Sequence, residues 1–592
     1  MTMKQEIIKG GSFLLSEIGP KDVFTPEDFT EEHKMIAKMT ADFIAGEVVP
    51  YDDEIEHQNL DVIVRLLKQA GELGLLGADI PEEYGGTGLD KVSSLLIGEN
   101  FARSSSLAVS HTCHVGIGSL PISMFGTEQQ KKRFLAGLAT GELLGAYCLT
   151  EPSSGSDALG AKTTAVLSDD GSYYILNGAK QFITNAGFAD LFIVYAKIDG
   201  EKFTAFIVEK DFPGVSTGAE EKKMGIKGSS TRSLILEDCR VPVENVLGEI
   251  GKGHVIAFNI LNIGRYKLGG NCVGASKWAI ELSVKYAKER KQFGKPIADF
   301  PLIQKKLADM AIRTYAAESM SYRTAGLIEE GLARLDQVPS EKGRQVGDAI
   351  AEYAIECSIN KVFGSECLDF VADEGVQIHG GYGFTQEYKI ERIYRDSRIN
   401  RLFEGTNEIN RLLIPGTLLK KAVKGELSFM DAVVNLQKEL ISYKSPSIDD
   451  NDPLAFEKAL IRAAKQVFLL VGGESVQKYQ KQLDGEQEIL EALANITIDI
   501  FAMESVLLRT EKALKRADKN AEHLEDMTKV YVREAFTRIE NMAFEALTAI
   551  ESETALLTVK QLINFGFTNT ISLKRRIAAR MIEAEKYVTV RS

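Results

Sequence analysis

The chain has 592 residues, more than one hydrophobic core usually serves, so three or four domains are expected. Hydrophobic residues make up 44% of it and charged residues 26%, a balance typical of a globular enzyme that excludes a fibrous or disordered protein. The formal net charge of -14 argues against nucleic acid as the main partner, because affinity for a phosphate backbone depends on Lys and Arg.

Periodicity of the apolar residues divides the chain into five parts. Residues 1–143 have a helical pattern, residues 144–254 hold short β-rich runs, and residues 255–420 return to long helical periodicity. Residues 421–452 are interpreted as a connecting helix and linker, and residues 453–592 as a last helical domain. The predicted fold class is therefore mostly α with a central β domain, whose strands are expected at residues 173–176, 191–196, 204–208 and 233–236.

The clearest break in the sequence is residues 442–453, which are polar and contain Pro446 and Pro453. Acidic and basic residues alternate after it as on a solvated helix face, unlike a DNA-binding tail. One apolar stripe in this region is favoured as core packing, with contact to a membrane surface as the alternative. Its members are Leu460, Ile461, Ala464, Val467, Phe468 and Val471.

The cysteines and the N-terminus bear on the cellular compartment. The six cysteines are scattered without Cys-x-x-Cys pairs, which predicts reduced thiols in a reducing compartment. Residues 1–18 mix charged residues among the apolar ones and resemble neither a signal peptide nor a transit peptide. No apolar run reaches the roughly 20 residues that span a bilayer. We expect a cytoplasmic protein, or the processed form of an organellar one.

One carboxylate stands out near the end of the second helical region. Glu404 lies between the bulky Phe403 and Gly405, so water is removed on one side, which raises the proton affinity, and a ligand can approach on the other. Thr406 is predicted to cap the helix that follows, with Glu408 in its first turn. Alone, this pattern is also that of an ordinary acidic turn.

Four other segments carry residue types that suit a nucleotide-like cofactor. Residues 146–157 offer backbone amides and small hydroxyl residues to a planar ring, and residues 181–185 place an aromatic and a hydroxyl near a strand end. Residues 289–297 set a guanidinium beside an aromatic, which suits a pyrophosphate and an adenine. Residues 377–384 contain glycines that admit close approach to phosphates.

Each segment also has a simpler interpretation. Arg290 alone suits a surface ion pair, and residues 377–384 alone suit a plain helix terminus. His111 and His114 stand at the spacing of a metal site, but no further ligand cluster follows, so helix packing is favoured and no metal is predicted. The single tryptophan, Trp278, is interpreted as a core residue of the helical bundle.

The order of the five segments across helical, β and helical regions resembles the acyl-CoA dehydrogenase family over nearly the whole chain. The additional C-terminal helical region is most similar to the very-long-chain branch. This resemblance implies a helical N-terminal domain, a β barrel or sandwich, a four-helix bundle that carries Glu404, and the added helical domain.

The resemblance also implies FAD bound between the β domain and the bundle, and a role for each matching residue. Arg290 and Phe293 would hold the adenine dinucleotide end, joined by Gln377 and Gly381 from a partner subunit. Flavin contacts would come from Tyr147, Leu149, Thr150, Ser156, Phe182, Ile183 and Thr184, with Thr406 and Glu408 completing the site. Contacts to the acyl-CoA substrate would come from Ser156, Asn262, Arg265, Phe403 and Gly405, with Arg265 facing the coenzyme A phosphates.

Glu404 would remove the Cα proton of the substrate while a hydride leaves Cβ for the flavin. Some relatives carry the base on another helix, where this chain has Gly264, and a glycine cannot abstract a proton. The same glycine widens the acyl cavity, which favours long chains. Phe182 stands where many relatives have Trp, so stacking beside the flavin is kept without the indole N–H.

The expected activity is dehydrogenation of medium to very long fatty acyl-CoA to trans-2-enoyl-CoA in β-oxidation, with electrons passed to an electron-transfer flavoprotein. The protein would be a homodimer or a dimer of dimers, because the partner subunit contributes to the FAD site. Three alternatives remain: an acyl-CoA oxidase that reduces oxygen, a non-catalytic assembly protein of the same fold, and a nucleic-acid-associated relative. The acidic composition argues against the last.

Overall fold

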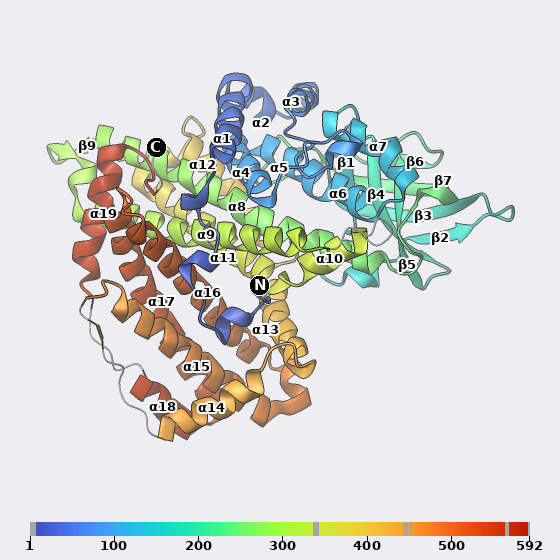
Figure 1. The fold of residues 1–592 in the computed structure, drawn as a ribbon. Coiled ribbons are helices and arrows are strands. Elements are labelled where there is room, and N and C mark those ends of the chain that lie inside the picture. Colours follow the sequence, from blue (N-terminus) through green and yellow to red (C-terminus); the bar gives the residue numbers. More distant parts are fainter. Residues whose placement is uncertain (1–7, 336–341, 442–447, 450, 563–567, 590–592) are drawn as a thin grey trace, which may run out of the picture.

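Two long helices, α8 (Gly253–Glu289) and α9 (Pro301–Ala333), run side by side through the middle of the molecule (Figure 1). The computed structural model describes residues 8–335, 342–441, 448–449, 451–562 and 568–589. The helix α11 packs against both long helices, and α13 packs against α11. These and the smaller elements between them are α10 (Lys342–Ala351), α11 (Ala354–His379), α12 (Lys389–Ser397), α13 (Asn407–Val423), and the short strands β9 (Lys291–Gln292) and β10 (Lys295–Pro296).

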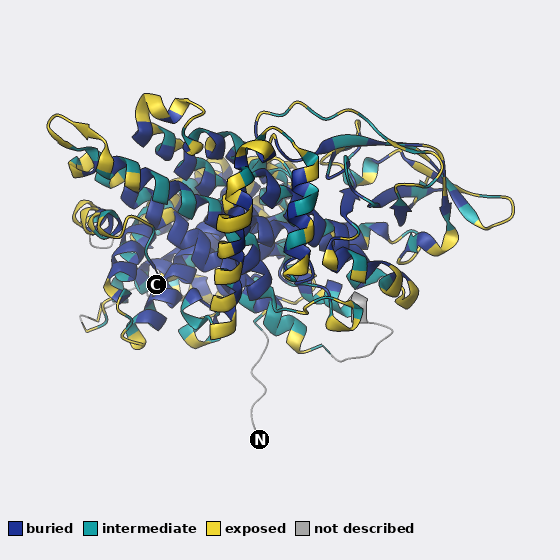
Figure 2. Cartoon of the chain, turned by 90° about the horizontal axis from the view of Figure 1, so that it is seen from above, coloured by how far each residue is buried: buried dark blue, intermediate teal, exposed yellow. Residues whose placement is uncertain are grey.

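Helices α8 and α11 approach each other closely because glycines face each other where they cross. A Cβ atom at Gly364 would lie 3.0 Å from the Cα of Gly269, and one at Gly269 would lie 3.1 Å from Asn360. The distance between packed helices depends on the side chains at the contact, so two glycines permit the closest approach. Buried residues gather along these central helices, whereas exposed residues mark the periphery (Figure 2).

Short helices form the N-terminal part, as the sequence predicts, and α4 packs against both α8 and α9. The N-terminal ends of several are capped by side chains, for example by Thr30 and Thr127. The helices are α1 (Glu31–Phe43), α2 (Asp52–Glu56), α3 (Leu60–Glu72), α4 (Lys91–Phe101), α5 (Ser106–Thr112), α6 (Leu120–Phe125) and α7 (Glu128–Thr140).

The β domain is one mostly antiparallel sheet with strand order β6-β7-β3-β2-β4-β5-β8, and β1 pairs in parallel with β4. All four β-rich runs predicted from the sequence lie in its strands β3, β4, β5 and β7, so the mostly helical fold with a central β domain is confirmed. The strands are β1 (Gly145–Cys148), β2 (Thr164–Leu167), β3 (Tyr173–Thr184), β4 (Leu191–Ile198), β5 (Lys202–Glu209), β6 (Val215–Thr217), β7 (Thr231–Pro242) and β8 (Val246–Leu247).

A β-bulge near the end of β3 determines where Phe182 points. The register between β3 and β7 shifts between Lys180 and Ile183, and Phe182 has a φ of 59°. A bulge inserts an extra residue and redirects a side chain relative to the sheet. The Phe182 ring is consequently 63% exposed, whereas its neighbour Ile183 is buried.

The C-terminal helices pack beneath the bundle, with α16 against α9 and α13 (Figure 1). The apolar stripe from Leu460 to Val471 is buried here, which confirms core packing. Most of the predicted linker at residues 442–453 lies outside the described residues. Within the described residues, no helix combines the length and hydrophobicity needed to cross a bilayer. The helices are α14 (Phe429–Ile441), α15 (Ala455–Tyr479), α16 (Gln487–Lys515), α17 (Ala521–Ile550), α18 (Glu553–Leu562) and α19 (Thr570–Ala584).

A buried charge network joins the C-terminal helices to the bundle and to the N-terminal segment. Arg509 on α16 is fully buried and pairs with Glu318 on α9 at 2.6 Å and with Glu27 at 2.9 Å. Lys277 on α8 pairs with Glu318 at 2.5 Å and with Glu99 on α4 at 2.6 Å. Burial acts to raise the pKa of Glu318, but the charges of Arg509 and Lys277 outweigh it and lower that pKa to about 2.

Replacing Arg509 with methionine should destabilise the protein strongly. The Arg509→Met variant leaves Glu318 and Glu27 buried with fewer positive charges, which lowers the free energy of unfolding by about 3 to 5 kcal/mol. The stabilisation from the ionised Glu318 is complete above pH 4.5, its ordinary pKa, and is lost as the pH falls toward 2. Without Arg509 the pKa of Glu318 rises, so acid unfolding should begin at a higher pH, as measured by circular dichroism.

Arg462→Met is the matched control. Arg462 pairs with Glu17 on the surface, where the two side chains are 68% and 89% exposed. Loss of such a pair should change the free energy of unfolding by less than about 1 kcal/mol. Equal urea denaturation midpoints for the two variants would contradict a structural role for the buried network.

Candidate active site

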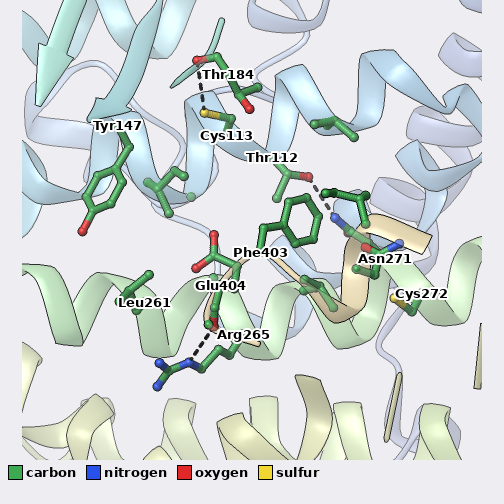
Figure 3. A pocket seen from close by; sticks show the side chains of 18 of the residues that line it. Thr112, Cys113, Tyr147, Thr184, Leu261, Arg265, Asn271, Cys272, Phe403 and Glu404 are labelled. Carbon is green, nitrogen blue, oxygen red and sulfur yellow. Dashed lines mark hydrogen bonds between the residues drawn. The ribbon is translucent and has the colours of Figure 1, made fainter. Parts of the chain in front are cut away.

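A cavity of about 640 Å³ lies where the β domain meets α8 and the turn before α13 (Figure 3). Its walls come from β1 and the loop after it, the end of β3, residues 102–117, residues 258–278 of α8, and residues 393–409. Because these segments are far apart in the sequence, the cavity forms only when the helical and β parts pack together. The Glu404 carboxylate points into it.

The turn that carries Glu404 has a strained backbone. Glu404 has a φ of 58° and Gly405 a φ of 78°, in a left-handed region that glycine adopts freely and other L-residues avoid. Arg265 Nε donates to the carbonyl oxygen of Glu404 at 3.2 Å, and Asn410 Nδ2 donates to that of Gly405 at 2.9 Å. These two side chains fix a conformation that projects the carboxylate into the cavity.

Burial raises the pKa of Glu404 to about 7, although the positive charges of Arg265 and Lys361 act in the opposite direction. Its Oε2 atom is buried and has no hydrogen-bond partner among the described residues. The raised proton affinity that the sequence predicts is therefore confirmed. A carboxylate with this pKa is partly ionised at neutral pH, which suits a general base.

Gly264 lies directly beside this carboxylate. A Cβ atom at Gly264 would lie 2.7 Å from Glu404 Oε2 and 2.8 Å from its Cδ, closer than real Cβ contacts. Glu404 occupies the space that a side chain on α8 would otherwise fill. Gly264 thus provides room for the carboxylate as well as part of the cavity wall.

The wall that the β domain contributes carries hydroxyl groups and aromatic rings. Phe182 presents its exposed ring to the cavity, and the hydroxyl of Tyr147 is buried with no hydrogen-bond partner among the described residues. This wall leaves polar atoms and a flat apolar surface available to a planar ligand. Every flavin contact predicted in these segments lines the cavity: Tyr147, Leu149, Thr150, Ser156, Phe182, Ile183 and Thr184.

The predicted substrate contacts Asn262, Arg265, Phe403 and Gly405 also line the cavity. The placement of Arg265 differs from the expected contact with phosphates, because its side chain is 5% exposed and bonds within the protein. Besides holding the carbonyl of Glu404, it donates from Nη1 to Asn262 Oδ1 at 3.0 Å. The position of Arg265 therefore supports a role in holding the turn that carries Glu404.

Two predicted cofactor contacts next to the turn do not line the cavity. Thr406 Oγ1 accepts from the backbone N–H of Ile409 at 3.3 Å, which confirms the predicted helix cap. Glu408 lies in the first turn of α13 with its side chain exposed. Their proposed role in cofactor binding stays a prediction.

Four more predicted contacts lie at the far end of α8. The α8 helix runs from Arg265 at the cavity to Arg290 just after its end, a rise of about 37 Å. There the Arg290 guanidinium lies over the ring of Tyr382, in the segment that follows Gln377 and Gly381, and Phe293 is 93% exposed. Within one chain these residues form one group away from the cavity, rather than dividing between the cavity and a partner subunit.

The two histidines of the N-terminal part bond to the backbone. His111 Nε2 lies 3.2 Å from the carbonyl oxygen of Leu75, and His114 Nε2 lies 2.9 Å from that of Leu138. Among the described residues, no group of three or more His, Cys, Asp or Glu is arranged to hold a metal ion. Both histidines therefore fit helix packing, the interpretation that the sequence favoured.

Three polar residues around the turn were not identified from the sequence: Asn407, Asn410 and Lys361. Lys361 is fully buried, and its Nζ donates to Asn407 Oδ1 at 2.7 Å. A signal existed for Lys361, since it lies four residues from both Cys357 and Ser365 on a helix face whose other members are apolar or small. A lysine on such a face is a departure from the pattern.

Models of the acyl-CoA dehydrogenase family match four parts of the chain. The N-terminal domain matches residues 30–142, the middle domain residues 146–239, and two different models of a C-terminal domain match residues 251–419 and 463–561. The last match covers much of the helical region that follows the bundle.

Similar proteins cover nearly the whole chain. A probable acyl-CoA dehydrogenase of Bacillus subtilis is 58% identical over 98% of this chain and 99% of its own length. The very long-chain specific acyl-CoA dehydrogenase of Macaca fascicularis mitochondria is 36% identical over 85% of this chain and 78% of its own. A crystal structure of an acyl-CoA dehydrogenase complexed with FAD from Bacillus anthracis superposes with a TM-score of 0.96 at 60% identity, covering 98% of this chain and 100% of that one. The chain belongs to the acyl-CoA dehydrogenase family and is an oxidoreductase of that type.

Adding one methyl group at Gly264 should impair catalysis without unfolding the protein. In Gly264→Ala the clashing atoms belong to the end of the flexible Glu404 side chain, so the carboxylate moves rather than the helix. A displacement of about 1 Å from productive geometry can lower a rate about 100-fold, so kcat with an acyl-CoA substrate should fall by about 10- to 100-fold. Steady-state kinetics and thermal denaturation measure the two effects.

Gly416→Ala on α13 is the control, because a Cβ atom there meets no atom of other described parts of the chain within 4 Å. It should leave kcat unchanged and should keep or slightly raise the thermal midpoint, since alanine is favoured over glycine inside a helix. If Gly264→Ala retains wild-type kcat, the carboxylate does not need the space beside α8.

Proposed function

We propose that this protein oxidises fatty acyl-CoA of medium to very long chain to trans-2-enoyl-CoA, with FAD as its cofactor. One observation carries this proposal: the carboxylate of Glu404 is buried in a large cavity, has a pKa raised to about 7, and has no partner among the described residues. A buried carboxylate without a partner can accept a proton from a weakly acidic carbon of a substrate that enters the same cavity.

The β-domain wall fits FAD, because the exposed Phe182 ring and the cavity-lining residues Tyr147 and Thr150 can contact a flat heteroaromatic ring. Residues 147–150, Ser156 and residues 182–184 would hold the flavin. When bound, FAD supplies the acceptor for the hydride that leaves Cβ of the substrate. Arg290, Phe293, Gln377 and Gly381 of a second copy would hold the adenine dinucleotide end, since they are far from the cavity of their own chain.

Glu404 would accept the Cα proton of the thioester. The thioester oxygen gains negative charge as this proton leaves, and the backbone N–H of Glu404 is available to donate to it because it bonds to no other described residue. Arg265 and Asn410 keep this N–H and the carboxylate in a fixed relation by holding the turn. The buried Oε2 atom is shielded from water, and a substrate in the cavity would displace water from the rest of the carboxylate.

The shape of the cavity supports long acyl chains. Residues 268–278 of α8 line it beyond Gly264, and the rise from Gly264 to Trp278 is about 21 Å. Leu268, Cys272 and Ala275 on this stretch are apolar or weakly polar, so they suit a hydrocarbon tail. Trp278, interpreted from the sequence as a core residue, is partly buried and lies at this end of the lining.

We further propose that the reaction belongs to fatty-acid β-oxidation in the cytoplasm and that the electrons pass to an electron-transfer flavoprotein. The family resemblance supports these assignments. The distance between the cavity and Arg290 supports a homodimer or a dimer of dimers, because one chain does not bring its two predicted parts of the FAD site together. An intact Glu404 argues against a non-catalytic assembly protein.

Glu404→Gln should abolish reduction of the cofactor by substrate. Glutamine keeps the size of the side chain but cannot accept the proton, so anaerobic addition of palmitoyl-CoA should no longer bleach the flavin absorbance, while FAD content stays at the wild-type level. Loss of one catalytic base typically lowers the rate by about 100- to 10,000-fold. Bleaching at the wild-type rate would exclude Glu404 as the base.

The same preparation separates the dehydrogenase from an oxidase. With acyl-CoA as the only reductant in air, a dehydrogenase should release little hydrogen peroxide and should reduce an added electron-transfer flavoprotein. Stoichiometric peroxide without transfer to the flavoprotein would favour the oxidase.

Filling the far end of the cavity should shorten the preferred substrate. In Ala275→Phe the added ring would occupy the apolar stretch of α8 that lines the cavity. We expect kcat/KM to fall by about 10-fold or more for palmitoyl-CoA, since several buried methylene contacts are lost, and to change little for butyryl-CoA. An equal loss for both substrates would place the acyl tail elsewhere.

A further inference from the structure

Lys361 is a buried cation that the proposed reaction does not use directly. It lies on α11 with its side chain fully buried, and its Nζ donates to Asn407 Oδ1 at 2.7 Å. A buried ammonium is unfavourable unless a specific role or partner compensates for its lost hydration. Its partner Asn407 is the first residue of α13, three positions after Glu404.

Both ends of the Asn407 amide are held by α11. Besides Lys361, Ser365 Oγ donates to Asn407 Oδ1 at 3.3 Å, while Asn407 Nδ2 donates to Glu366 Oε1 at 3.0 Å. Asn407, Lys361 and Ser365 are buried, so the bonds among these three residues are shielded from water, whereas Glu366 is partly exposed. In the low dielectric of the interior such bonds are stronger than on the surface.

The catalytic turn is thereby held from two helices. Arg265 on α8 bonds to the carbonyl of Glu404, and Lys361 on α11 bonds to Asn407 just beyond the turn. The two cations can serve one turn because α8 and α11 come close at Gly269 and Gly364. The strained backbone at Glu404 is thus held by Arg265 on one side and, through Asn407, by Lys361 on the other, and these two residues lie on the packed helices α8 and α11.

We propose that Lys361 is a positioning residue for Glu404, which fixes the start of α13 through Asn407 and places a second positive charge behind the carboxylate. This inference rests on the proposed role of Glu404 as the base. It assigns two separable effects to one side chain: a geometric effect that passes through Asn407, and an electrostatic effect that does not need Asn407.

The charged and titratable groups around Lys361 and Glu404 come from several elements. Arg265 and Cys272 face it from α8, Glu408 from α13, and Cys113 and Tyr147 from the segments that line the cavity. Burial lowers the pKa of Lys361 to about 8, with the charge of Arg265 acting in the same direction and Cys272, Glu404 and Glu408 opposing it. Lys361 is therefore mostly charged at neutral pH.

The sign of the electrostatic effect follows from these charges. A positive charge near a carboxylate favours the ionised form, so Lys361 lowers the pKa of Glu404 from the value that burial alone would give. Removing the charge should raise that pKa, and the base would then be protonated over a wider pH range. The acid limb of the pH profile should move to higher pH.

Two substitutions separate the two effects. Lys361→Met removes the charge and its hydrogen bond while keeping a side chain of similar length, whereas Asn407→Ala removes the bonds of the amide to Lys361, Ser365 and Glu366 but keeps the charge of Lys361. Both should slow flavin reduction by palmitoyl-CoA about 10-fold at saturating substrate, because the carboxylate is less well placed. Only Lys361→Met should shift the pKa of Glu404, upward by about one unit.

The pKa is read without turnover from the infrared carboxyl band that disappears in Glu404→Gln. This reading separates a failure of the inference from a failure of the proposed function. If palmitoyl-CoA does not bleach the wild-type protein, the proposed function is wrong, whereas the titration still shows whether Lys361 acts on Glu404.

Lys424→Met is the matched control, since this lysine lies just after α13 with a side chain that is 71% exposed. It should change neither the rate nor the pKa. A folded Lys361→Met protein with the wild-type pKa of Glu404 overturns the electrostatic effect. If Lys361→Met does not fold, Asn407→Ala decides the geometric effect alone, and a wild-type reduction rate in it overturns the proposal.

Discussion

Removing a carboxylate from water is the constraint on which the rest of the site depends. Burial alone raises the pKa of Glu404 and disfavours the ionised form that the proposed base needs, and nearby positive charges restore part of the stability of its charge. The cost of burying this charge is only partly offset. No described residue bonds to Oε2, and the positive charges of Arg265 and Lys361 act on the carboxylate without a direct ion pair. A direct ion pair would hold the carboxylate charged but would lower its proton affinity below what a weakly acidic carbon requires. Two indirect charges leave the pKa near neutrality and the carboxylate oxygen free.

Helix α8, which holds the turn of Glu404, also bears on how many chains would form one complete site. Helix α8 carries Arg265 and Gly264 beside Glu404, then continues to Arg290 at the far end of the molecule. Under the proposed assignment of Arg290 to the adenine dinucleotide end, the cofactor would contact the cavity of one chain and the far end of α8 in a second chain. On this proposal cofactor binding would require oligomerisation, and a second copy would cover the exposed Phe293 at this end.

Features that depend on neighbours in the sequence could be predicted, and those that depend on packing could not. The cap by Thr406 and the strands β3, β4, β5 and β7 follow from local residue types and their periodicity. The direction of Arg265 could not be predicted, because a guanidinium on a helix suits a phosphate as well as a backbone carbonyl, and only the packing of α13 decides between them. The role of Lys361 was missed for the same reason. Its partner Asn407 lies 46 residues later and meets it only because α13 packs against α11.

The C-terminal helices are also connected to the turn that carries Glu404, although they lie on the other side of the bundle. Glu366, which accepts from the Asn407 amide, also pairs with Arg411 at 2.8 Å. The Arg411 Nε atom in turn donates to Asn495 Oδ1 on α16 at 2.7 Å. A hydrogen-bonded chain thus runs from α16 through α13 and α11 to Asn407, three residues after Glu404. Because α16 also carries the buried Arg509 that joins it to α9, the C-terminal helices hold the outer face of the bundle against which the turn is positioned. Their contribution to this site is mechanical support of the helix that begins at Asn407.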